Sequence, residues 1–409
     1  MSCKDRLFEA QSHHLFLTFI YFPLMKDLII IGAGAAGLSA ARAALASNSS
    51  VLILDMYADP LRKVTASGGG RCNFTNSDAT AKRYFGGNPA FAISVLSRIK
   101  PTGILEWAAI NGIRTEEKAP GQFFCANGAK AMTSALLKGA KGASIIQNCE
   151  ATDIEKNDGG FLVRSKKGDF HGKRVIIASG GISFPSLGVS DIGLKIAKKF
   201  GHAIQPPVPG LVALKTDIFP KDLAGASLPV QIRIGKIKIE DPLLFTHFGI
   251  GGPACYRASM YDLEQGFHID FLPGRSALEL LLRAKKTEGQ KLPLTVLCAH
   301  LPAKFARWIS WGYDKKLIDC KDSTLAELAE RINKFIICSG ALSYRGFQSA
   351  EVMAGGISTD KISSKTLESK LCPGLYFAGE VLDITGDLGG FNLHFAFASG
   401  IVAGGSCVR

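Results

Sequence analysis

The chain has 409 residues, of which 47% are hydrophobic, and this length is sufficient for two domains. Its formal net charge is +13, but lysine and arginine are spread along the sequence without a basic stripe interleaved with aromatic residues. A basic surface that attracts anionic cofactors therefore accounts for the charge better than nucleic-acid binding does. The ten cysteines lack CxxC or metal-type spacing, and no apolar run approaches the ~20 residues of a membrane-spanning helix. We expect a cytoplasmic protein that holds no metal and spans no membrane.

Residues 1–24 precede the first predicted strand and do not belong to its pattern. Their apolar segment, residues 15–24, is too short to span a membrane, and no small-residue cleavage site of the kind that follows a signal peptide comes after it. We expect residues 1–24 to be an extension with little fixed structure.

An apolar run of β-branched type, Leu28–Ile31, predicts a strand that is buried on both faces. It leads into the sequence GAGAAG at residues 32–37 and then into an alanine-rich segment. A second apolar run, Val51–Leu54, ends at Asp55. This order of strand, GxGxxG turn, helix, strand and acid is typical of a βαβ unit that binds a dinucleotide.

The residues of this unit have distinct chemical roles. Gly32 permits the tight turn, Gly34 lets backbone N–H groups approach a pyrophosphate, and Gly37 lets the helix and strand pack closely. The positive end of the helix faces the phosphates, and the Asp55 carboxylate can accept hydrogen bonds from a ribose diol. We therefore predict an ADP-containing cofactor bound by Gly32, Gly34, Ala35, Ala36, Gly37 and Asp55.

A second glycine-rich segment, Gly68–Gly70, follows the ribose-binding acid and is continued by Arg71, Asn73 and Thr75. Exposed backbone donors next to a cation are suited to wrapping an anionic ligand. The alternative is an ordinary flexible turn, but the position of the segment directly after the βαβ unit argues against it.

GAGAAG and the sequence RKVTASGGGRCNFTN at residues 62–76 together resemble a bacterial NAD(P)/FAD-dependent oxidoreductase family, which includes aminoacetone oxidase-like and bile-acid-reductase-like flavoproteins. The resemblance implies FAD, with Arg62 and Lys63 near its adenosine or pyrophosphate end. It places Asn73, Phe74 and Thr75 near the flavin. The same loop contributes Gly69 and Gly70 to the predicted cofactor site.

Further motifs of this family occur later in the chain. The resemblance implies that the backbone of Ala151 meets the adenine and that Gly180, in the sequence ASGG, approaches the cofactor from the other side of the sheet. Glu380, which follows Gly379 at the end of a buried strand, would hold the ribityl hydroxyls. Gly389 and the residues that open the last helix would face the flavin, and the site residues predicted there are Gly390, Asn392 and Leu393.

Two residues are candidates for catalysis. His247 lies in LFTHFGIGGP, which resembles the family motif LFTHxGxSGP, and its side chain titrates near neutrality, so it can donate a proton. The alternative is a histidine that only holds the turn by hydrogen bonds. Arg71 is the second candidate, and it could instead supply positive charge beside the reduced flavin.

The predicted fold is α/β: an FAD-binding, Rossmann-type domain of the two-dinucleotide-binding flavoprotein class with an inserted substrate domain, β-rich and then helical. The FAD domain comprises residues 25–205 and 341–409, and the insert comprises residues 206–340, beginning at the proline-rich boundary. Within the insert, we predict strands at 231–239 and 267–271, and helices at 276–285, 292–308 and 324–337.

The predicted function is an FAD-dependent oxidoreductase that reduces a small organic substrate with electrons from NAD(P)H. No second GxGxxG follows a strand, so the nicotinamide would visit the flavin without a domain of its own. One alternative is an amine oxidase that passes electrons to oxygen. Another is an RNA-associated flavoprotein, although we expect no nucleic-acid partner. The sequence does not indicate an oligomeric state.

Overall fold

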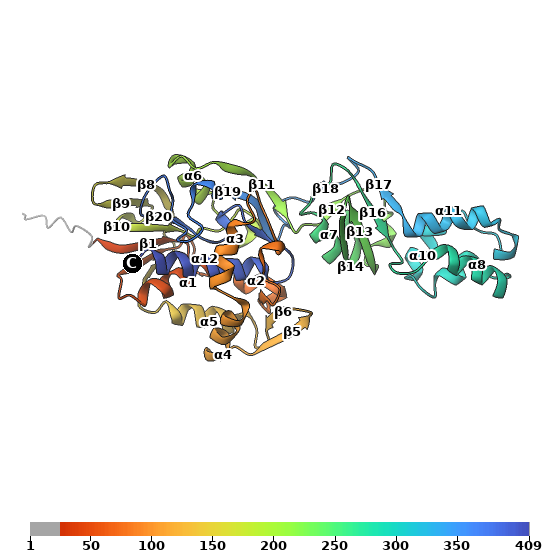
Figure 1. Ribbon diagram of the computed structural model, residues 1–409, viewed down its shortest axis with the longest axis horizontal. Coiled ribbons are helices and arrows are strands. Elements are labelled where there is room, and N and C mark those ends of the chain that lie inside the picture. Colours follow the sequence, from red (N-terminus) through yellow and green to blue (C-terminus); the bar gives the residue numbers. More distant parts are fainter. Residues whose placement is uncertain (1–24, 409) are drawn as a thin grey trace, which may run out of the picture.

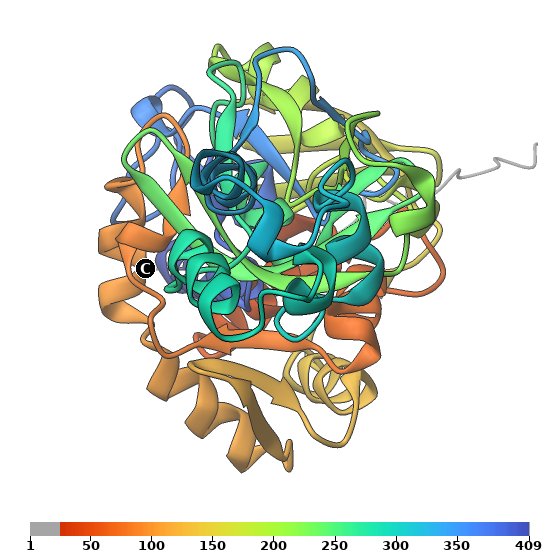
Figure 2. The ribbon, with the colours of Figure 1, turned by 90° about the vertical axis from the view of Figure 1, so that its right-hand side faces the viewer.

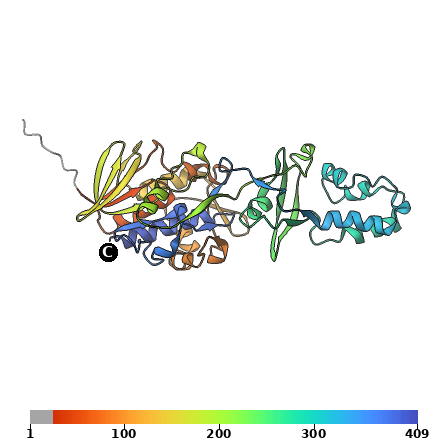
Figure 3. The same cartoon turned by 90° about the horizontal axis from the view of Figure 1, so that it is seen from above.

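The structure is a computed structural model that describes residues 25–408, so our prediction for residues 1–24 lies outside the described residues. The described chain forms an elongated molecule (Figures 1 and 3). A large α/β domain contains both ends of the described chain, and an inserted domain projects from it. Within residues 25–408, no helix is long and apolar enough to cross a membrane.

The large domain is built on a seven-stranded sheet in which β1 pairs in parallel with β2 on one side and with β10 on the other. The apolar runs that predicted buried strands fill its centre, where Ile29, Ile53 and Ile176 are fully buried. Its parallel strands are β7 (Ser144–Ile146), β2 (Val51–Leu54), β1 (Lys26–Ile31), β10 (Gly168–Ile177) and β20 (Leu375–Phe377). Its antiparallel extension consists of β9 (Gly160–Ser165) and β8 (Ala151–Asn157).

Helices α1 (Ala35–Leu45) and α12 (Phe391–Ser406) lie side by side against this sheet (Figure 1). Their contact depends on small residues. A Cβ atom on Gly400 would lie 2.2 Å from the Ala36 carbonyl oxygen, and one on Gly404 would lie 2.1 Å from the Ala40 carbonyl oxygen. The contact between the two backbones therefore brings the first and last helices of the large domain together.

Smaller elements surround this core. Most of residues 62–139 lie below the sheet in Figure 1, residues 185–199 provide a helix beside β8, and a short strand near the end of the chain, β21, pairs with β4. These elements are α2 (Arg62–Gly70), β3 (Asn73–Asn76), β4 (Tyr84–Phe85), α3 (Phe91–Arg98), α4 (Pro101–Ile110), β5 (Thr115–Ala119), β6 (Gln122–Cys125), α5 (Ala129–Gly139), α6 (Ile192–Lys199) and β21 (Thr385–Gly386).

The inserted domain has its own hydrophobic core and its own seven-stranded sheet. In sheet order, the strands are β17 (Phe335–Ile337), β16 (Phe267–Asp270), β13 (Ser227–Ile234), β14 (Ile237–Thr246), β15 (Gly249–Gly251), β12 (Leu214–Lys215) and β18 (Ser343–Tyr344). The helices are α7 (Gly252–Ala258), α8 (Ala277–Thr287), α9 (Pro293–Leu297), α10 (Ala303–Ile309) and α11 (Asp322–Asn333).

Three of the predicted elements differ in the insert. The segment predicted as one strand at 231–239 is a hairpin, because Gly235 turns the chain with φ of 55°. The helix predicted at 292–308 is two helices, since Pro302 precedes α10. Phe335–Ile337, predicted as the end of a helix, pairs with β16 as β17.

Two antiparallel strands, β11 (Ile204–Gly210) and β19 (Val352–Ile357), connect the insert to the large domain. β18 still belongs to the insert sheet because it pairs with β12. The chain therefore passes from the insert sheet to the β11–β19 sheet between Tyr344 and Val352. This is a few residues after residue 340, the predicted end of the insert.

Candidate cofactor site

A cavity of about 500 Å³ opens where the parallel strands of the large domain end. Ile31, Leu54 and Ala178 line it, and each lies at or directly after the carboxyl end of its strand. Ligands bind at this edge in open parallel sheets. The volume is within the range of ~300–1,000 Å³ that is usual for cofactor and ligand sites.

The glycines of the βαβ unit differ in their surroundings. A Cβ atom on Gly32 would lie 2.4 Å from the Ala178 carbonyl oxygen, and one on Gly37 would lie 1.9 Å from the Gly32 carbonyl oxygen. Gly34 has no atom within 4 Å of that position and lines the cavity. Gly32 and Gly34 thus border the cavity together with Ala35 and Ala36, whereas Gly37 supports the turn from behind.

Asp55 is positioned by two backbone groups. Its Oδ2 atom accepts a hydrogen bond of 2.7 Å from the Ala33 N–H, and its Oδ1 atom accepts one of 2.9 Å from the Tyr57 N–H. Each oxygen keeps a second lone pair for a diol. Arg62 places its guanidinium 4.7 Å from the centre of the Tyr57 ring, and Ala151 completes this end of the cavity.

Lys63 and Glu380 meet in the lining of the cavity. The Lys63 ammonium donates to Oε2 of Glu380 at 2.7 Å and to the Ser183 hydroxyl at 2.7 Å. Burial opposes ionisation of the Glu380 carboxyl, but Lys63 and two backbone N–H donors hold its pKa below the ordinary value. Lys63 therefore contacts Glu380, whereas Arg62, its neighbour in sequence, lies over the Tyr57 ring.

The second glycine segment folds back on itself. Gly68 and Gly69 have φ of 57° and 64°, and the N–H groups of Arg71 and Cys72 bond to carbonyls at the end of α2. Gly69 lines the cavity and has open space beside it, whereas Gly70 does not line it. Gly180 borders the cavity from β10, and Gly379 borders it from the end of β20.

Asn73 lines the cavity, and its amide donates to Oε1 of Gln122 at 3.0 Å. Its Oδ1 atom is buried without a hydrogen-bond partner among the described residues, as is the hydroxyl of Ser179, another lining residue. Phe74 and Thr75 do not line the cavity. Phe74 is fully buried, and the Thr75 hydroxyl lies 2.8 Å from Nδ1 of His394.

The start of α12 forms the opposite wall. Gly390 precedes the helix with φ of 94°, and a Cβ atom there would lie 2.6 Å from the Thr75 carbonyl oxygen. Asn392 accepts from the Gly386 N–H and donates to its carbonyl, so its amide holds the preceding loop. Gly390, Asn392 and Leu393 line the cavity, and the positive end of the α12 dipole lies at this wall.

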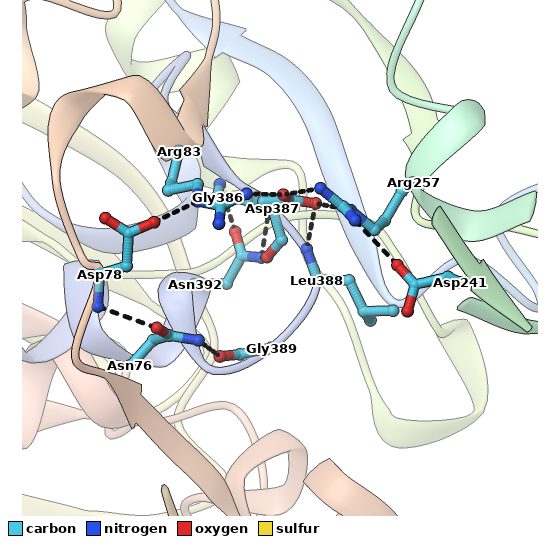
Figure 4. Close-up of polar contacts among 10 residues, drawn as sticks. All are labelled: Asn76, Asp78, Arg83, Asp241, Arg257, Gly386, Asp387, Leu388, Gly389 and Asn392. Carbon is cyan, nitrogen blue, oxygen red and sulfur yellow. Dashed lines mark hydrogen bonds and ion pairs between the residues drawn. The ribbon is translucent and has the colours of Figure 1, made fainter. Parts of the chain in front are cut away.

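A charged network joins this loop to the insert (Figure 4). Arg257 of α7 contacts both oxygens of Asp387 at 3.2 Å and Asp241 of β14 at 2.8 Å. Arg83 contacts Asp387 from the other side at 3.3 Å. The Asp387 side chain is only 7% exposed, and a buried carboxylate needs a partner. Arg257 and Arg83 neutralise it and thereby fix the loop that leads to Gly389.

The two predicted catalytic residues lie outside the lining of the cavity. His247 is exposed in the tight turn between β14 and β15. The Arg71 side chain is 55% exposed and lies 3.9 Å from Glu116. Their catalytic roles stay predictions.

Glu351 is a functional candidate that sequence reasoning missed. It lies directly before β19 and lines the cavity together with Leu211, so both segments that connect the insert reach the site. Its side chain is exposed at the cavity and has no ion pair or hydrogen bond among the described residues, and desolvation by the neighbouring protein atoms raises its pKa above the ordinary value. An unpartnered carboxyl in a cleft indicates function, but its sequence context, AEVMAGG, carries no signal that distinguishes it.

These residues fit FAD. A turn with open space at Gly34, a diol acceptor at Asp55 and unsatisfied polar atoms at Asn73 and Ser179 line one continuous cavity. When bound, FAD would accept a hydride from an electron donor and pass it to a substrate. Among residues 25–408, no group of three or more His, Cys, Asp or Glu side chains is placed to hold a metal ion.

The fold and the cavity together define a flavoprotein that binds a dinucleotide in a Rossmann-type domain and carries an inserted domain. Residues 26–406 match the family described as HI0933-like protein Rossmann domain, and the chain belongs to this family. It is an FAD-dependent oxidoreductase, which confirms the predicted family resemblance, the predicted fold class and FAD as a cofactor.

Two relatives are similar over nearly their whole length. A ribosomal RNA dihydrouridine synthase of Haemophilus influenzae is 37% identical over 389 residues, which cover 91% of this chain and 96% of the relative. A 3-dehydro-bile acid delta(4,6)-reductase of Clostridium scindens is 31% identical over 407 residues, which cover 93% and 98%. The solved structure of a 3-ketosteroid delta1-dehydrogenase from Sterolibacterium denitrificans shares the fold, with 12% identity, a TM-score of 0.51 and coverage of 94% and 99%.

Proposed function

We propose that the protein uses NAD(P)H and FAD to reduce a carbon–carbon double bond conjugated with a carbonyl, and that this bond is the C5–C6 bond of a uracil base in ribosomal RNA. Dihydrouridine arises from uridine by saturation of this bond, and a 3-oxo steroid with Δ4,6 unsaturation presents the same type of conjugated system. The two relatives named above are therefore linked by one chemistry.

RNA is favoured over a steroid as substrate because the identity to the ribosomal RNA relative is higher, 37% against 31%. The net charge of +13 supports a polyanionic substrate. This proposal departs from our expectation that nucleic acid is not a partner.

The observation that carries the proposal is the unpartnered Glu351 carboxyl in the cavity. Reduction of a conjugated double bond adds a hydride to the carbon β to the carbonyl and a proton to the α carbon. A carboxyl with a raised pKa keeps its proton to a higher pH than an ordinary glutamic acid and can donate it to the α carbon. Glu351 takes this role in preference to His247, because Glu351 lines the cavity and His247 does not.

The electron donor enters the same cavity. The sequence contains one GxGxxG turn between a strand and a helix, and FAD would use it, so NAD(P)H would reach the flavin without a nucleotide-binding turn of its own. The oxidised nicotinamide leaves before the uracil base enters. We expect ping-pong kinetics for this reason.

An anaerobic two-step experiment tests the proposal. The FAD-loaded protein is reduced with NADH or NADPH and mixed with an in vitro transcript of ribosomal RNA, while flavin absorbance is followed. We expect reoxidation of the flavin and, in the digested RNA, a nucleoside with two additional hydrogen atoms. Reoxidation by a Δ4,6 3-oxo steroid but not by RNA would reassign the substrate. Reoxidation by neither, with reoxidation only when oxygen is admitted in a separate run, would contradict the proposal.

A further inference from the structure

One side of α10 is an exposed stripe of two cations and an indole ring. Lys304 and Arg307 lie three residues apart in α10, which places them on the same side of the helix, and Trp311 follows in the turn directly after the helix ends. The opposite side is buried, since Phe305 and Ile309 pack into the core of the insert. Trp311 is 77% exposed, which is unusual for so large an aromatic side chain.

The cations of this stripe are not neutralised. Among the described residues, the side chains of Lys304 and Arg307 form no ion pair or hydrogen bond with another residue, and the same holds for Lys315 in the loop that follows. Asp314 is the acid that lies closest to them along the chain. The charges of this stripe are therefore available to a ligand.

We propose that Lys304, Arg307 and Trp311, the α10 surface, dock an unpaired segment of the RNA substrate. Phosphates would contact the two cations, and a base would stack on the indole ring of Trp311. Single-stranded nucleic acids are bound in this way, by positive charge along the backbone and by aromatic side chains under the bases. The choice of RNA as the partner rests on the proposed function.

The position of α10 agrees with a long substrate. The insert projects from the large domain, and α10 lies in its outer part, beyond the sheet (Figures 1 and 3). Viewed from that end, the helices of the insert lie in front of the domain that contains the cavity (Figure 2). A small substrate needs only the cavity, whereas an RNA whose target base enters the cavity can extend along the insert to the α10 surface.

The test measures binding without turnover. The full-length, oxidised, FAD-loaded protein is titrated against fluorescein-labelled oligouridylate at several salt concentrations, with no nicotinamide present. The variants are Trp311→Ala and the double variant Lys304→Glu/Arg307→Glu. The double variant Arg283→Glu/Lys286→Glu on α8 is the control, because it changes the charge by the same amount at two other exposed cations, whose side chains have no partner within residues 25–408.

We expect Trp311→Ala to weaken binding about tenfold or more, because one stacked base is lost. The Lys304/Arg307 variant should lower the slope of log K against log salt by about 1.4, as two phosphate contacts to a single strand are lost. The α8 control should keep most of the affinity and the slope. All variants should keep their FAD and their unfolding temperature, since the substituted side chains are exposed.

Wild-type affinity in both α10 variants, an equal loss in the α8 control, or no binding by the wild-type protein would each overturn this inference. Binding that depends on the α10 surface without formation of dihydrouridine would contradict the proposed reaction and leave the docking surface in place. The two proposals therefore fail separately.

Discussion

The Nζ atom of Lys63 lies 2.7 Å from Oε2 of Glu380, although the two residues are 317 positions apart in the sequence. The same carboxylate accepts hydrogen bonds from the Ser183 hydroxyl and from the N–H groups of Gly181 and Met353. It therefore joins segments on several sides of the cavity. All four of its lone-pair positions are used, so a ribityl hydroxyl could bond to it only by displacing one of these donors.

Replacing Lys63 with methionine should destabilise the protein, because it leaves a largely buried carboxylate without its cation. We expect a loss of about 2–3 kcal/mol in the free energy of unfolding, below the ~3–5 kcal/mol of a fully buried pair since Lys63 is 33% exposed. Chemical denaturation measures this loss. Lys173→Met, which removes an exposed pair with Asp27, is the matched control and should cost less than about 1 kcal/mol. Equal losses in the two variants would refute the organising role of Glu380.

Substitutions at two glycines of the βαβ turn should affect cofactor binding and stability separately. Gly34→Val should fold normally and bind no FAD, because its side chain enters the open space of the cavity. Gly37→Ala should lower stability by about 1–3 kcal/mol, since its Cβ atom would overlap the Gly32 carbonyl oxygen. Thermal unfolding and the flavin content of the purified proteins check both effects. FAD retained by Gly34→Val would show that the cavity is not the cofactor site.

A buried histidine should make stability depend on pH. The burial of His394 lowers its pKa to about 4, and Thr75 and the Ile99 carbonyl hold its ring. The unfolded chain binds a proton near pH 6.5 and the folded chain does not, so stability falls as pH decreases from about 6.5 to about 4. The loss should reach about 3 kcal/mol.

His394→Gln tests this effect, because glutamine can keep polar contacts in place without titrating. The variant should lose less stability than the wild-type protein between pH 6.5 and pH 4, as measured by denaturation at each pH. The same pH dependence in both proteins would show that other groups cause it.

The nucleotide-binding turn could be predicted from the sequence because its signal is local. Strand, turn, helix and acid follow one another within residues 28–55, and the physical reason for each glycine depends on its immediate neighbours. The helix predicted at 292–308 failed at Pro302, a break that the sequence already contained. The prediction that Phe335–Ile337 ends a helix was wrong for a different reason. The apolar spacing of this segment also suits a helix, but the segment pairs with β16 as a strand.

The charged and titratable parts of the site depend on contacts that no local pattern encodes. Asp387 meets Arg257 and Arg83 from segments 130 and 304 positions away, and Glu351 reaches the cavity only because β11 and β19 pair. The sequence places His247 in a motif, but the fold places it in an exposed turn. Chemistry that is assembled by tertiary packing therefore had to be seen in the structure.

The rate of uracil reduction should fall as pH rises through the raised pKa of Glu351, because only the protonated carboxyl donates a proton. Glu351→Gln should remove this dependence together with most of the activity. The rate of flavin reduction by NAD(P)H should not follow the same profile, since that step needs no proton from Glu351. If Glu351→Gln kept the pH dependence of the wild-type protein, another group would be the proton donor.

The most direct measurement compares the two half-reactions of the wild-type protein and Glu351→Gln, both FAD-loaded, under anaerobic stopped-flow conditions. We predict that NAD(P)H reduces the flavin of both proteins at similar rates. Reoxidation by the ribosomal RNA transcript should be about 10²–10⁴-fold slower in Glu351→Gln, the usual contribution of a general acid. Equal reoxidation rates in the two proteins, or a wild-type flavin that RNA does not reoxidise, would contradict the proposed function.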